Sequence, residues 1–285
     1  MLGIEGEVLA EHRSDLGILK SQDFQATLAT ICQPWDELYG ELPCLASGMI
    51  GSKQGWVDAG YLAAPCGFDA IASAAKDVSN LAGRKLWIMP GLRHIDAATQ
   101  TSDVMRGEEM QVFGAGIENG IVVLPGTHSK WVKVVDRRIV AFKTFMTGEA
   151  YSLFRHQSIL AKLMPLENAP TFDIKAFELG VRRSLSAPVE LLHHLFSVRT
   201  HGLFNELTSE AQADFLSGLL IGSEIGGGRG LFAAEHNEIA LIGEPALLKR
   251  YQAALSHAGL RARVVEAKTP VAALGLFQIA KQLRK

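Results

Sequence analysis

The sequence predicts an α/β fold, and two kinds of pattern favour this class. Short runs of apolar and β-branched residues alternate along the chain with longer segments of helical periodicity. One of these runs passes directly into a helix expected over residues 245–258, which has proline in its first turn and Gly259 just past its end. Strands followed at once by helices are typical of α/β proteins.

The expected strands are short apolar runs bounded by turn-forming residues. They lie at residues 7–11, 44–49, 85–89, 121–124, 131–135, 139–145, 238–242 and 261–265. A second helix is expected to begin at a capping box formed by Ser209 and Gln212 and to run to Glu224. The glycines at 226–228 lack the Lys-Ser/Thr ending of a P-loop, so we interpret them as a turn that breaks this helix.

The length of 285 residues suits two domains or one large one. The glycine-rich segment 114–120 separates a helical stretch from the strand that follows, which favours a boundary there. We therefore expect one domain over residues 1–118 and another over 119–285.

Composition excludes several classes of protein. A net charge of −2, without a long basic run, gives no footprint for nucleic acid or an anionic membrane. No apolar stretch reaches membrane-spanning length, and no signal peptide is expected at the start. The odd set Cys32, Cys44 and Cys66 lacks metal-type spacing and indicates reduced thiols, hence a cytoplasmic protein. The scattered histidines make a zinc site improbable, and any other metal ligand stays unassigned.

The most informative segment joins two β-branched runs, 121–124 and 131–135, through a small polar turn. A tight turn at Gly126 can aim backbone N–H groups and the side chains of Thr127, His128, Ser129 and Lys130 at one anion. This pattern predicts a phosphate-binding hairpin. An ordinary hairpin with a polar tip is the alternative.

The loop at 46–56 follows an apolar strand and contains glycine hinges, a lysine and an aromatic residue. Open α/β sheets bind ligands beyond the carboxyl ends of their strands, so Met49, Gly51 and Trp56 are candidates for a substrate wall. The alternative is a glycine-rich connection in which Trp56 packs on the core.

Three acids and an arginine lie close together at Asp103, Arg106, Glu108 and Glu109. A carboxylate can take the proton of a phosphoryl-acceptor hydroxyl, while the guanidinium can bind a substrate carboxylate through two hydrogen bonds. The segment therefore predicts a base and a clamp. Alternatively, the two glutamates merely favour a helix N-terminus through the helix dipole.

Two further glycine motifs stand at expected helix starts. Gly148 follows the strand at 139–145, and Gly243-Glu244 follows the strand at 238–242. Gly148 continues the hairpin segment as a further candidate for nucleotide binding. Gly243 lets the backbone approach a flat ligand, which suits an adenosine site in this architecture.

Taken together, these segments resemble the 2-dehydro-3-deoxygalactonokinases, sugar-acid kinases of the actin, Hsp70 and sugar-kinase superfamily. The resemblance covers essentially the whole chain, through SGMIGSKQGW, PGL, DVMRGEE, LPGTHSKWVKV, FMTGE, FLSGLLIGSE and LIGEP. It implies phosphorylation of the 6-hydroxyl of 2-dehydro-3-deoxy-D-galactonate by ATP with Mg²⁺, in galactonate catabolism. It also implies two ribonuclease-H-like lobes around a central cleft, with residues 1–118 binding the sugar acid and 119–285 binding the nucleotide.

The resemblance suggests individual roles as well. Glu108 corresponds to the catalytic carboxylate of related carbohydrate kinases, with Glu109 and Asp103 as rivals. Gly126-Thr127 resembles the second phosphate motif, and Gly243-Glu244 the adenosine motif. The helix at residues 271–283, which contains Gly275, resembles the helix that connects the lobes.

One departure from the family pattern concerns the start of the chain. Family members begin with a hairpin that carries Asp-x-Gly-Ser/Thr and then an arginine, and no such segment precedes residues 6–11. We expect the first lobe to lack these strands, roughly 15–25 residues by ordinary element lengths. Two other functions therefore stay open: a kinase for another 2-keto-3-deoxy acid, and a non-catalytic protein that binds nucleotide or sugar acid. A homodimer is also compatible with the sequence.

Overall fold

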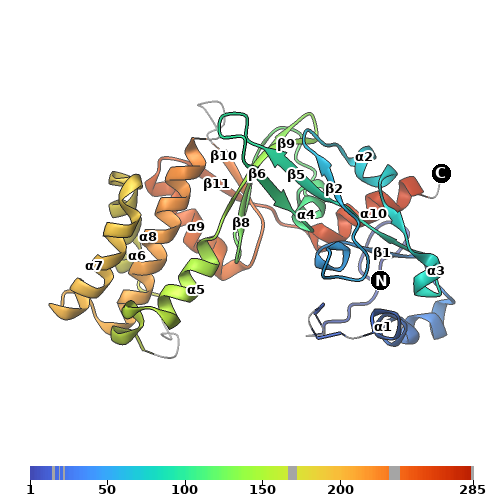
Figure 1. Cartoon of the computed structure of the whole chain (residues 1–285), viewed down its shortest axis with the longest axis horizontal. Helices are drawn as coiled ribbons and strands as arrows, with labels where there is room; N and C mark the ends of the chain where they lie inside the picture. The colour runs from blue at the N-terminus through green and yellow to red at the C-terminus, as the bar shows by residue number, and fades with distance from the viewer. Residues whose placement is uncertain (15–16, 19, 22, 166–171, 231–237, 284–285) are drawn as a thin grey trace. The chain divides into compact units, whose positions relative to one another are not determined.

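A computed structural model describes residues 1–14, 17–18, 20–21, 23–165, 172–230 and 238–283, and shows a mixed α/β fold (Figure 1). The chain divides into two compact units. Unit 1 contains Met1–Asn119, Val134–Phe142 and Glu266–Lys285, and unit 2 contains Gly120–Lys133 and Lys143–Val265. The predicted α/β class is confirmed.

Unit 1 holds two small sheets, each with one parallel and one antiparallel strand pair. In the first, β4 (Leu86–Ile88) pairs in parallel with β1 (Cys44–Ala46) and antiparallel with β3 (Lys76–Asp77). In the second, β5 (Gly91–Ile95) pairs in parallel with β2 (Tyr61–Ala63) and antiparallel with β6 (Ser102–Met105). The helices of this unit are α1 (Phe24–Tyr39), α2 (Phe68–Ser73), α3 (Ser79–Ala82), α4 (Glu108–Gly114) and α10 (Val271–Leu283), with a 3₁₀ turn, η1 (Met49–Gly51).

Helices α4 and α10 of unit 1 pack through glycines. A Cβ placed on Gly114 would lie 1.7 Å from the backbone oxygen of Val271, and one on Gly275 would lie 2.1 Å from the backbone oxygen of Met110. Only glycine permits such contact between two helix backbones. The position of α4, whose first turn carries Glu108 and Glu109, is therefore fixed by α10.

Unit 2 contains most of a five-stranded sheet. Its order is β11 (Arg261–Val264), β10 (Glu238–Leu241), β7 (Gly120–Leu124), β8 (Ser129–Val135) and β9 (Arg138–Phe145). The segment Val134–Phe142, which includes the end of β8 and most of β9, is assigned to unit 1. Strands β7, β10 and β11 are parallel, so β7 and β10 end at the same edge of the sheet. The turn after β7 and the glycine after β10 consequently lie together: a Cβ on Gly243 would be 3.5 Å from the backbone oxygen of Pro125.

The helices of unit 2 are α5 (Thr147–Gln157), α6 (Ile174–Ser186), α7 (Leu191–Leu203), α8 (Ser209–Arg229) and α9 (Pro245–His257), with 3₁₀ turns η2 (Ile159–Leu163) and η3 (Pro188–Glu190). Helices α6, α7 and α8 lie side by side (Figure 1). Gly180 and Gly218 let α6 and α8 touch, since a Cβ on Gly218 would lie 2.0 Å from the backbone oxygen of Phe177. Helix α8 is buried along most of its length.

The prediction that residues 226–228 break a helix is wrong, because α8 continues through them to Arg229. Their role is steric. A Cβ on Gly228 would lie 2.7 Å from the Trp131 ring, and one on Gly227 would lie 2.9 Å from the Phe145 ring. The helix stays intact there because tertiary packing outweighs the low helix propensity of glycine.

Other boundaries differ in smaller ways. The run at 7–11 is not a strand: Val8 forms only an isolated bridge with Leu2, and Val8 and Leu9 are exposed, so no neighbouring strand covers them. Strands β2, β3, β5 and β6 were not predicted. The cap of α8 is Thr208, one residue before the expected Ser209, and it accepts a hydrogen bond from the N–H of Ala211. Helices α9 and α10 are confirmed, and no described helix is long and apolar enough to cross a bilayer.

Candidate substrate and nucleotide sites

Arg106 follows β6 in unit 1, and its guanidinium is only partly satisfied. Its Nη2 donates to the backbone oxygen of Gly60 at 2.9 Å, and its Cζ lies 4.2 Å from the centre of the Tyr61 ring. Its Nε and Nη1 are buried and have no hydrogen-bond partner among the described residues. A buried guanidinium with two open donors is suited to an anionic ligand.

The loop predicted as a substrate wall contacts this arginine. A Cβ on Gly51 would lie 3.2 Å from Nη1 of Arg106. Gly107 has a φ of 109°, and a Cβ there would lie 3.2 Å from the Cα of Gly48. The structure therefore brings Gly51 and Arg106 together, and it requires glycine at 107 for both backbone conformation and space.

The other two predicted wall residues have different surroundings. Met49 lies in η1 with about half of its surface exposed (51%). Trp56 stacks on Phe24 with ring centres 5.9 Å apart and packs against the core of unit 1. The side chain of Trp56 therefore has the core packing that the sequence left open as an alternative.

The three candidate carboxylates differ in burial. Glu108 is half-buried in the first turn of α4, and its Oε2 accepts the backbone N–H of Arg106 at 3.0 Å. Glu109 is fully buried, and both of its oxygens lie 2.8 Å from the backbone nitrogen of Gly107. Burial raises the pKa of Glu109 to about 7. Asp103 lies on β6 and accepts the N–H of Val104 at 2.7 Å.

In unit 2, the predicted phosphate hairpin packs directly on the start of α5. A Cβ on Gly148 would lie 2.5 Å from the backbone oxygen of Gly126 and 2.8 Å from the Cα of Thr127. The N–H of Glu149 donates to the backbone oxygen of Thr127 at 3.0 Å, and its carboxylate lies 2.5 Å from Nε2 of His128. The hairpin at Gly126 and the start of α5 at Gly148 are therefore in direct contact.

Only part of the predicted turn is accessible. Thr127 and His128 are exposed, whereas Ser129 and Lys130 lie in β8 and are buried. The Ser129 hydroxyl donates to Glu224 at 2.7 Å, and Nζ of Lys130 lies 3.4 Å from the backbone oxygen of His128. The exposed hydroxyl of the turn is therefore that of Thr127. Beyond β10, Gly243 and Glu244 are exposed, and Glu244 is the N-cap residue of α9.

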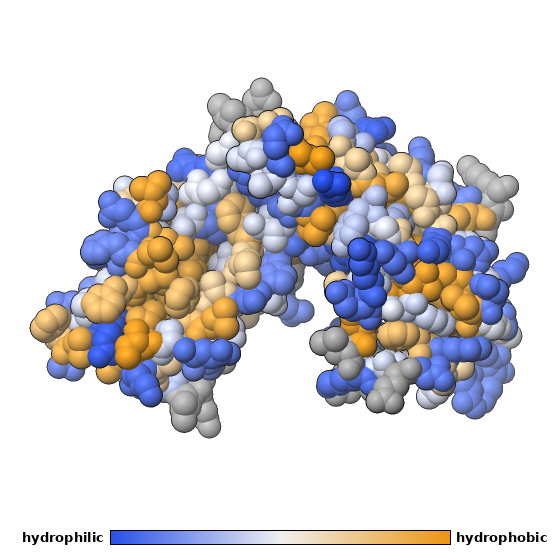
Figure 2. Space-filling model, in the orientation of Figure 1, coloured by the Kyte–Doolittle hydropathy of each residue, from blue (hydrophilic) through white to orange (hydrophobic). Residues whose placement is uncertain are grey.

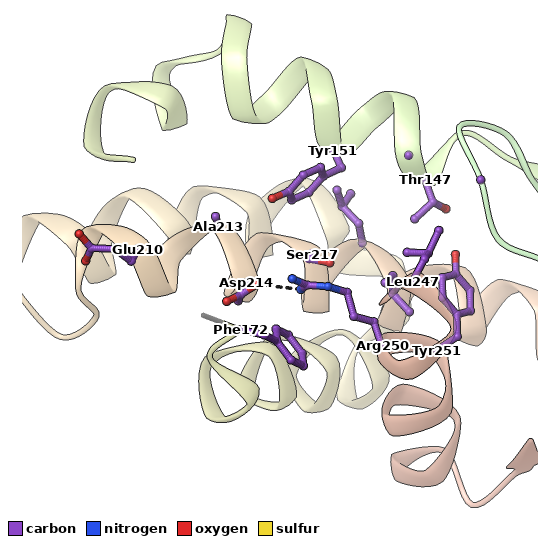
Figure 3. Close-up of a pocket in the computed structure, with 14 residues that line it drawn as sticks. Thr147, Tyr151, Phe172, Glu210, Ala213, Asp214, Ser217, Leu247, Arg250 and Tyr251 are labelled. Atoms are coloured by element: carbon purple, nitrogen blue, oxygen red, sulfur yellow. Dashed lines mark ion pairs between the residues drawn. The ribbon is translucent and has the colours of Figure 1, made fainter. Parts of the chain in front are cut away.

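A cavity of about 440 Å³ in unit 2 begins beside this hairpin (Figure 3). Gly126, Thr147 and Gly148 line it at the hairpin, and α5, α8 and α9 supply most of the remaining walls. Its lining also includes Tyr151, Phe172, Glu210, Ala213, Asp214, Ser217, Leu220, Ile221, Leu247, Arg250 and Tyr251. The volume and the mixture of apolar walls with a few polar groups are typical of small-molecule sites.

One wall of the cavity carries a charged pair against an aromatic ring. Nη1 of Arg250 lies 2.7 Å from Oδ1 of Asp214, and its Cζ lies 4.0 Å from the centre of the Phe172 ring (Figure 3). The other oxygen of Asp214 accepts the backbone N–H of Asp173 at 2.8 Å. These contacts hold the guanidinium as a flat, fixed surface.

A buried carboxylate, Glu224 of α8, lies behind the hairpin end of the cavity. Its Oε1 accepts Ser129 Oγ and Trp131 Nε1, each at 2.7 Å. Its Oε2 accepts Tyr251 Oη at 2.6 Å and also the hydroxyl of Thr147. One carboxylate therefore joins β8, α5 and α9, and burial raises its pKa although these hydrogen bonds oppose the shift.

Several of these residues were not among the predicted site residues: Thr147, Asp214, Glu224, Arg250 and Tyr251. A signal existed for two of them. Glu224 is a lone acid in the apolar stretch FLSGLLIGSE, and a buried acid needs partners. Thr147 precedes the Gly148 that was identified. Nothing in the sequence indicated the other three.

Comparison with known proteins gives a consistent result. The profile of the 2-keto-3-deoxy-galactonokinase family matches residues 1–279. "Probable 2-dehydro-3-deoxygalactonokinase DgoK1" of Rhizobium meliloti is 34% identical over 293 residues, covering 99% of this chain and 92% of the relative. The 2-dehydro-3-deoxygalactonokinase of Escherichia coli is 36% identical over 279 residues, covering 95% and 90%. A crystal structure from Sinorhizobium meliloti, of a protein assigned to the same activity, superposes with a TM-score of 0.90 at 34% identity, covering 99% and 94%.

Proposed function

This chain belongs to the 2-keto-3-deoxy-galactonokinase family, and from that premise we propose that it transfers the γ-phosphoryl group of ATP to the 6-hydroxyl of 2-dehydro-3-deoxy-D-galactonate. It is a kinase of galactonate catabolism. The observation that carries this conclusion is the family match along almost the whole chain. The two candidate sites supply the matching chemistry, an anion clamp beside carboxylates in unit 1 and a cavity beside a glycine hairpin in unit 2.

The sugar acid binds in unit 1, with its carboxylate on Arg106. The open donors of that guanidinium leave hydrogen bonds and a positive charge for an anionic group such as a carboxylate. Gly51 leaves the space beside Nη1 free of a side chain. Met49 adds an exposed apolar surface to the wall, whereas Trp56 supports the loop from the core and does not face the substrate.

Glu108 is the proposed general base. It is half-buried, so an incoming hydroxyl can reach it, whereas Glu109 is fully buried and both its oxygens accept from Gly107. As the 6-oxygen attacks the γ-phosphorus, its proton passes to the carboxylate, and the bond to the β-phosphate oxygen breaks to release ADP. Asp103 and Glu109 remain the alternative bases.

ATP binds in unit 2. The apolar walls and the Arg250 plane suit a nucleoside, and the hairpin at Gly126, with Thr127 and His128, suits the phosphates. Gly243 and Glu244 lie beside the hairpin and begin α9, which lines the cavity. Ser129 and Lys130 act from inside β8, by fixing the hairpin and by adding a positive charge near it.

Magnesium accompanies the nucleotide in this proposal. Among the described residues, no three His, Cys, Asp or Glu side chains form a group that could hold a metal ion. Mg²⁺ keeps several waters and is commonly bound through substrate phosphates plus one or two carboxylates. The residues present therefore fit an ion that arrives with ATP and neutralises the charge on its phosphates.

We extend the proposal to the architecture that the sequence predicts. Unit 1 is the sugar-acid lobe and unit 2 the nucleotide lobe of a ribonuclease-H-like kinase with a central cleft. Direct phosphoryl transfer supports this, because the 6-hydroxyl must reach the γ-phosphorus. The free thiols of Cys32, Cys44 and Cys66 support a cytoplasmic location.

A homodimer through α7 completes the proposal. Leu192, Phe196, Arg199 and Leu203 recur at intervals of four, three and four residues, which is the spacing of a coiled-coil seam. Leu192, Phe196 and Leu203 are exposed (84%, 56% and 51%), and apolar surface covers this part of unit 2 (Figure 2). Antiparallel pairing of two copies places Leu192 against Leu203 and Phe196 against Arg199, a cation–π contact.

The dimer is tested by sedimentation equilibrium. The native protein should sediment as a dimer, and Leu192→Glu with Phe196→Glu should give a folded monomer. A native protein that stays monomeric at micromolar concentrations contradicts this part of the proposal.

The experiment that tests the function is a coupled assay for ADP release. We expect turnover with 2-dehydro-3-deoxy-D-galactonate, ATP and Mg²⁺, and weaker turnover with the epimeric acid derived from gluconate. Faster turnover with that epimer would favour a kinase for another 2-keto-3-deoxy acid. ATP binding in calorimetry without turnover on any sugar acid would favour a binding protein of the same fold.

A further inference from the structure

The charged side chains of the nucleotide cavity nearly cancel one another. Among the described residues that line it, Glu210 and Asp214 are negative and Arg250 is positive, so their charges sum to −1. Such a lining offers no net attraction to a triphosphate. Figure 3 shows Glu210 and Asp214 toward one end of the cavity and Thr147, which lies beside the hairpin, toward the other. The two acids therefore lie away from the end assigned to the phosphates.

Asp214 holds Arg250 through charge. Nη1 of Arg250 lies 2.7 Å from Oδ1 of Asp214, but it has no aligned hydrogen bond to any described residue, so the contact is an ion pair. The side chain of Asp214 is 7% exposed and that of Arg250 is 25% exposed. Water and salt screen so buried a carboxylate weakly, and at this distance it offsets most of the attraction that the guanidinium exerts on other anions. Arg250 is therefore a poor ligand for phosphate.

The guanidinium of Arg250 is also held flat. One of its faces packs on the ring of Phe172, whose centre lies 4.0 Å from Cζ. Asp214 supports both layers of this stack, because its other oxygen accepts the backbone N–H of Asp173, the residue next to Phe172. The exposed part of Arg250 lies where these contacts leave it uncovered, and Figure 3 shows its side chain in the cavity between Phe172 and Tyr151. A flat cation presented in this way is suited to stacking on an aromatic ring.

We propose that Phe172, Arg250 and Asp214 form a stacking platform for the nucleobase, and that Asp214 determines its specificity by offsetting the charge of Arg250. The platform takes an uncharged flat ring on the guanidinium and leaves the triphosphate to the hairpin at Gly126. This inference rests on the proposed ATP site. An unpaired guanidinium in the same place would bind the phosphates instead, because phosphate oxygens accept strong hydrogen bonds from arginine.

Two substitutions separate stacking from charge. Arg250→Lys keeps a positive charge beside Asp214 and removes the flat guanidinium. Asp214→Asn keeps the shape of the side chain, and its carbonyl oxygen can still accept the N–H of Asp173, but the charge of Arg250 is no longer offset. Arg182→Lys is the matched control: Arg182 lies on α6 of unit 2, forms an ion pair with Glu178 at 3.7 Å, and is not part of the cavity lining.

The test measures how strongly ATP, adenosine and inorganic tripolyphosphate displace a fluorescent ATP analogue, at one Mg²⁺ concentration and one ionic strength. Arg250→Lys should weaken the binding of ATP and adenosine about 3–20-fold, the effect of one stacking contact, and leave that of tripolyphosphate unchanged. Asp214→Asn should strengthen tripolyphosphate binding at least about 3-fold, because the cavity gains a positive charge that is no longer offset. Damage to the fold cannot produce such a gain. Arg182→Lys should leave all three dissociation constants unchanged.

Three results would overturn this inference and leave the kinase proposal intact. They are a native protein on which ATP competes but adenosine does not, an Arg250→Lys protein that binds adenosine as the native protein does or loses tripolyphosphate equally, and an Asp214→Asn protein with unchanged tripolyphosphate affinity. A native protein that binds no ATP overturns the nucleotide site itself. If Asp214→Asn does not fold by circular dichroism, the contrast between adenosine and tripolyphosphate in Arg250→Lys decides alone.

Discussion

The carboxylate of Glu109 folds back on the backbone nitrogen of Gly107, with both oxygens 2.8 Å from that nitrogen and no exposed surface. Burial raises the pKa of this group to about 7, and the hydrogen bonds from the backbone oppose the shift only in part. A free glutamate titrates near 4.3. At a pH between these two pKa values, Glu109 keeps its proton in the folded protein but has lost it in the unfolded chain.

This relationship predicts a pH-dependent stability. A raised carboxyl pKa contributes stability that is complete below the unfolded value and is lost as the pH rises toward about 7. Glu109→Gln removes the titration, so the variant should gain stability relative to the native protein between pH 5 and pH 8, by at most roughly 3 kcal/mol. Urea unfolding at both pH values checks this. If the free energy of unfolding differs between the variant and the native protein by the same amount at pH 5 and at pH 8, Glu109 does not titrate in this range.

The second prediction concerns the chemical step. Glu108→Gln keeps the size of the side chain and removes the base, so kcat should fall about 10²–10⁴-fold with little change in the KM for the sugar acid. Steady-state kinetics with both substrates measure it. A variant with near-normal kcat would transfer the role to Glu109 or Asp103.

The pH profile separates these rivals. If Glu109 were the base, the acid limb of kcat/KM would have its midpoint near the raised pKa of about 7, and Glu109→Gln would abolish both activity and that limb. We expect instead that Glu109→Gln retains turnover.

The third prediction concerns the clamp. Arg106→Ala should raise the KM for the sugar acid more than it lowers kcat, because a contact to the substrate carboxylate is made equally in the ground state and the transition state. Arg93→Ala is the matched control, since Arg93 is exposed on β5 and donates to Ser102. Equal effects of the two substitutions on KM would show that Arg106 does not bind the acid.

The fourth prediction compares two glycines of the nucleotide site. A Cβ on Gly126 meets no protein atom within 4 Å, whereas one on Gly148 would lie 2.5 Å from the backbone oxygen of Gly126. Gly126→Val should therefore leave the melting temperature nearly unchanged but weaken ATP binding, because the side chain occupies the space of the ligand. Gly148→Ala should lower both. Native ATP affinity in Gly126→Val, measured by calorimetry, would mean that the hairpin binds something else.

The sequence predicted those parts of the fold that local pattern determines. Strands β7 and β10, and helices α9 and α10, have apolar runs with clear ends, such as Pro245 and Gly259 around α9. The glycines at 226–228 misled the prediction because Gly227 and Gly228 make room for the rings of Phe145 and Trp131, which lie far earlier in the chain. Helix propensity cannot indicate such packing.

The candidate site was predictable to a similar extent. Arg106 and Gly51 were identified as separate motifs, and the fold brings them within contact. The cluster around Glu224 was not predicted, because its partners Ser129, Trp131, Thr147 and Tyr251 come from three other elements far apart in the chain. Hydrogen bonds of that kind exist only in the folded protein.

The most direct test of the kinase assignment is ³¹P nuclear magnetic resonance of a reaction containing the protein, ATP, Mg²⁺ and 2-dehydro-3-deoxy-D-galactonate. Transfer to the primary 6-hydroxyl predicts loss of the γ-phosphate signal and growth of a phosphomonoester signal split into a triplet by the two hydrogens on C6. An unchanged γ-phosphate signal, release of inorganic phosphate alone, or a doublet from a secondary hydroxyl would contradict the account.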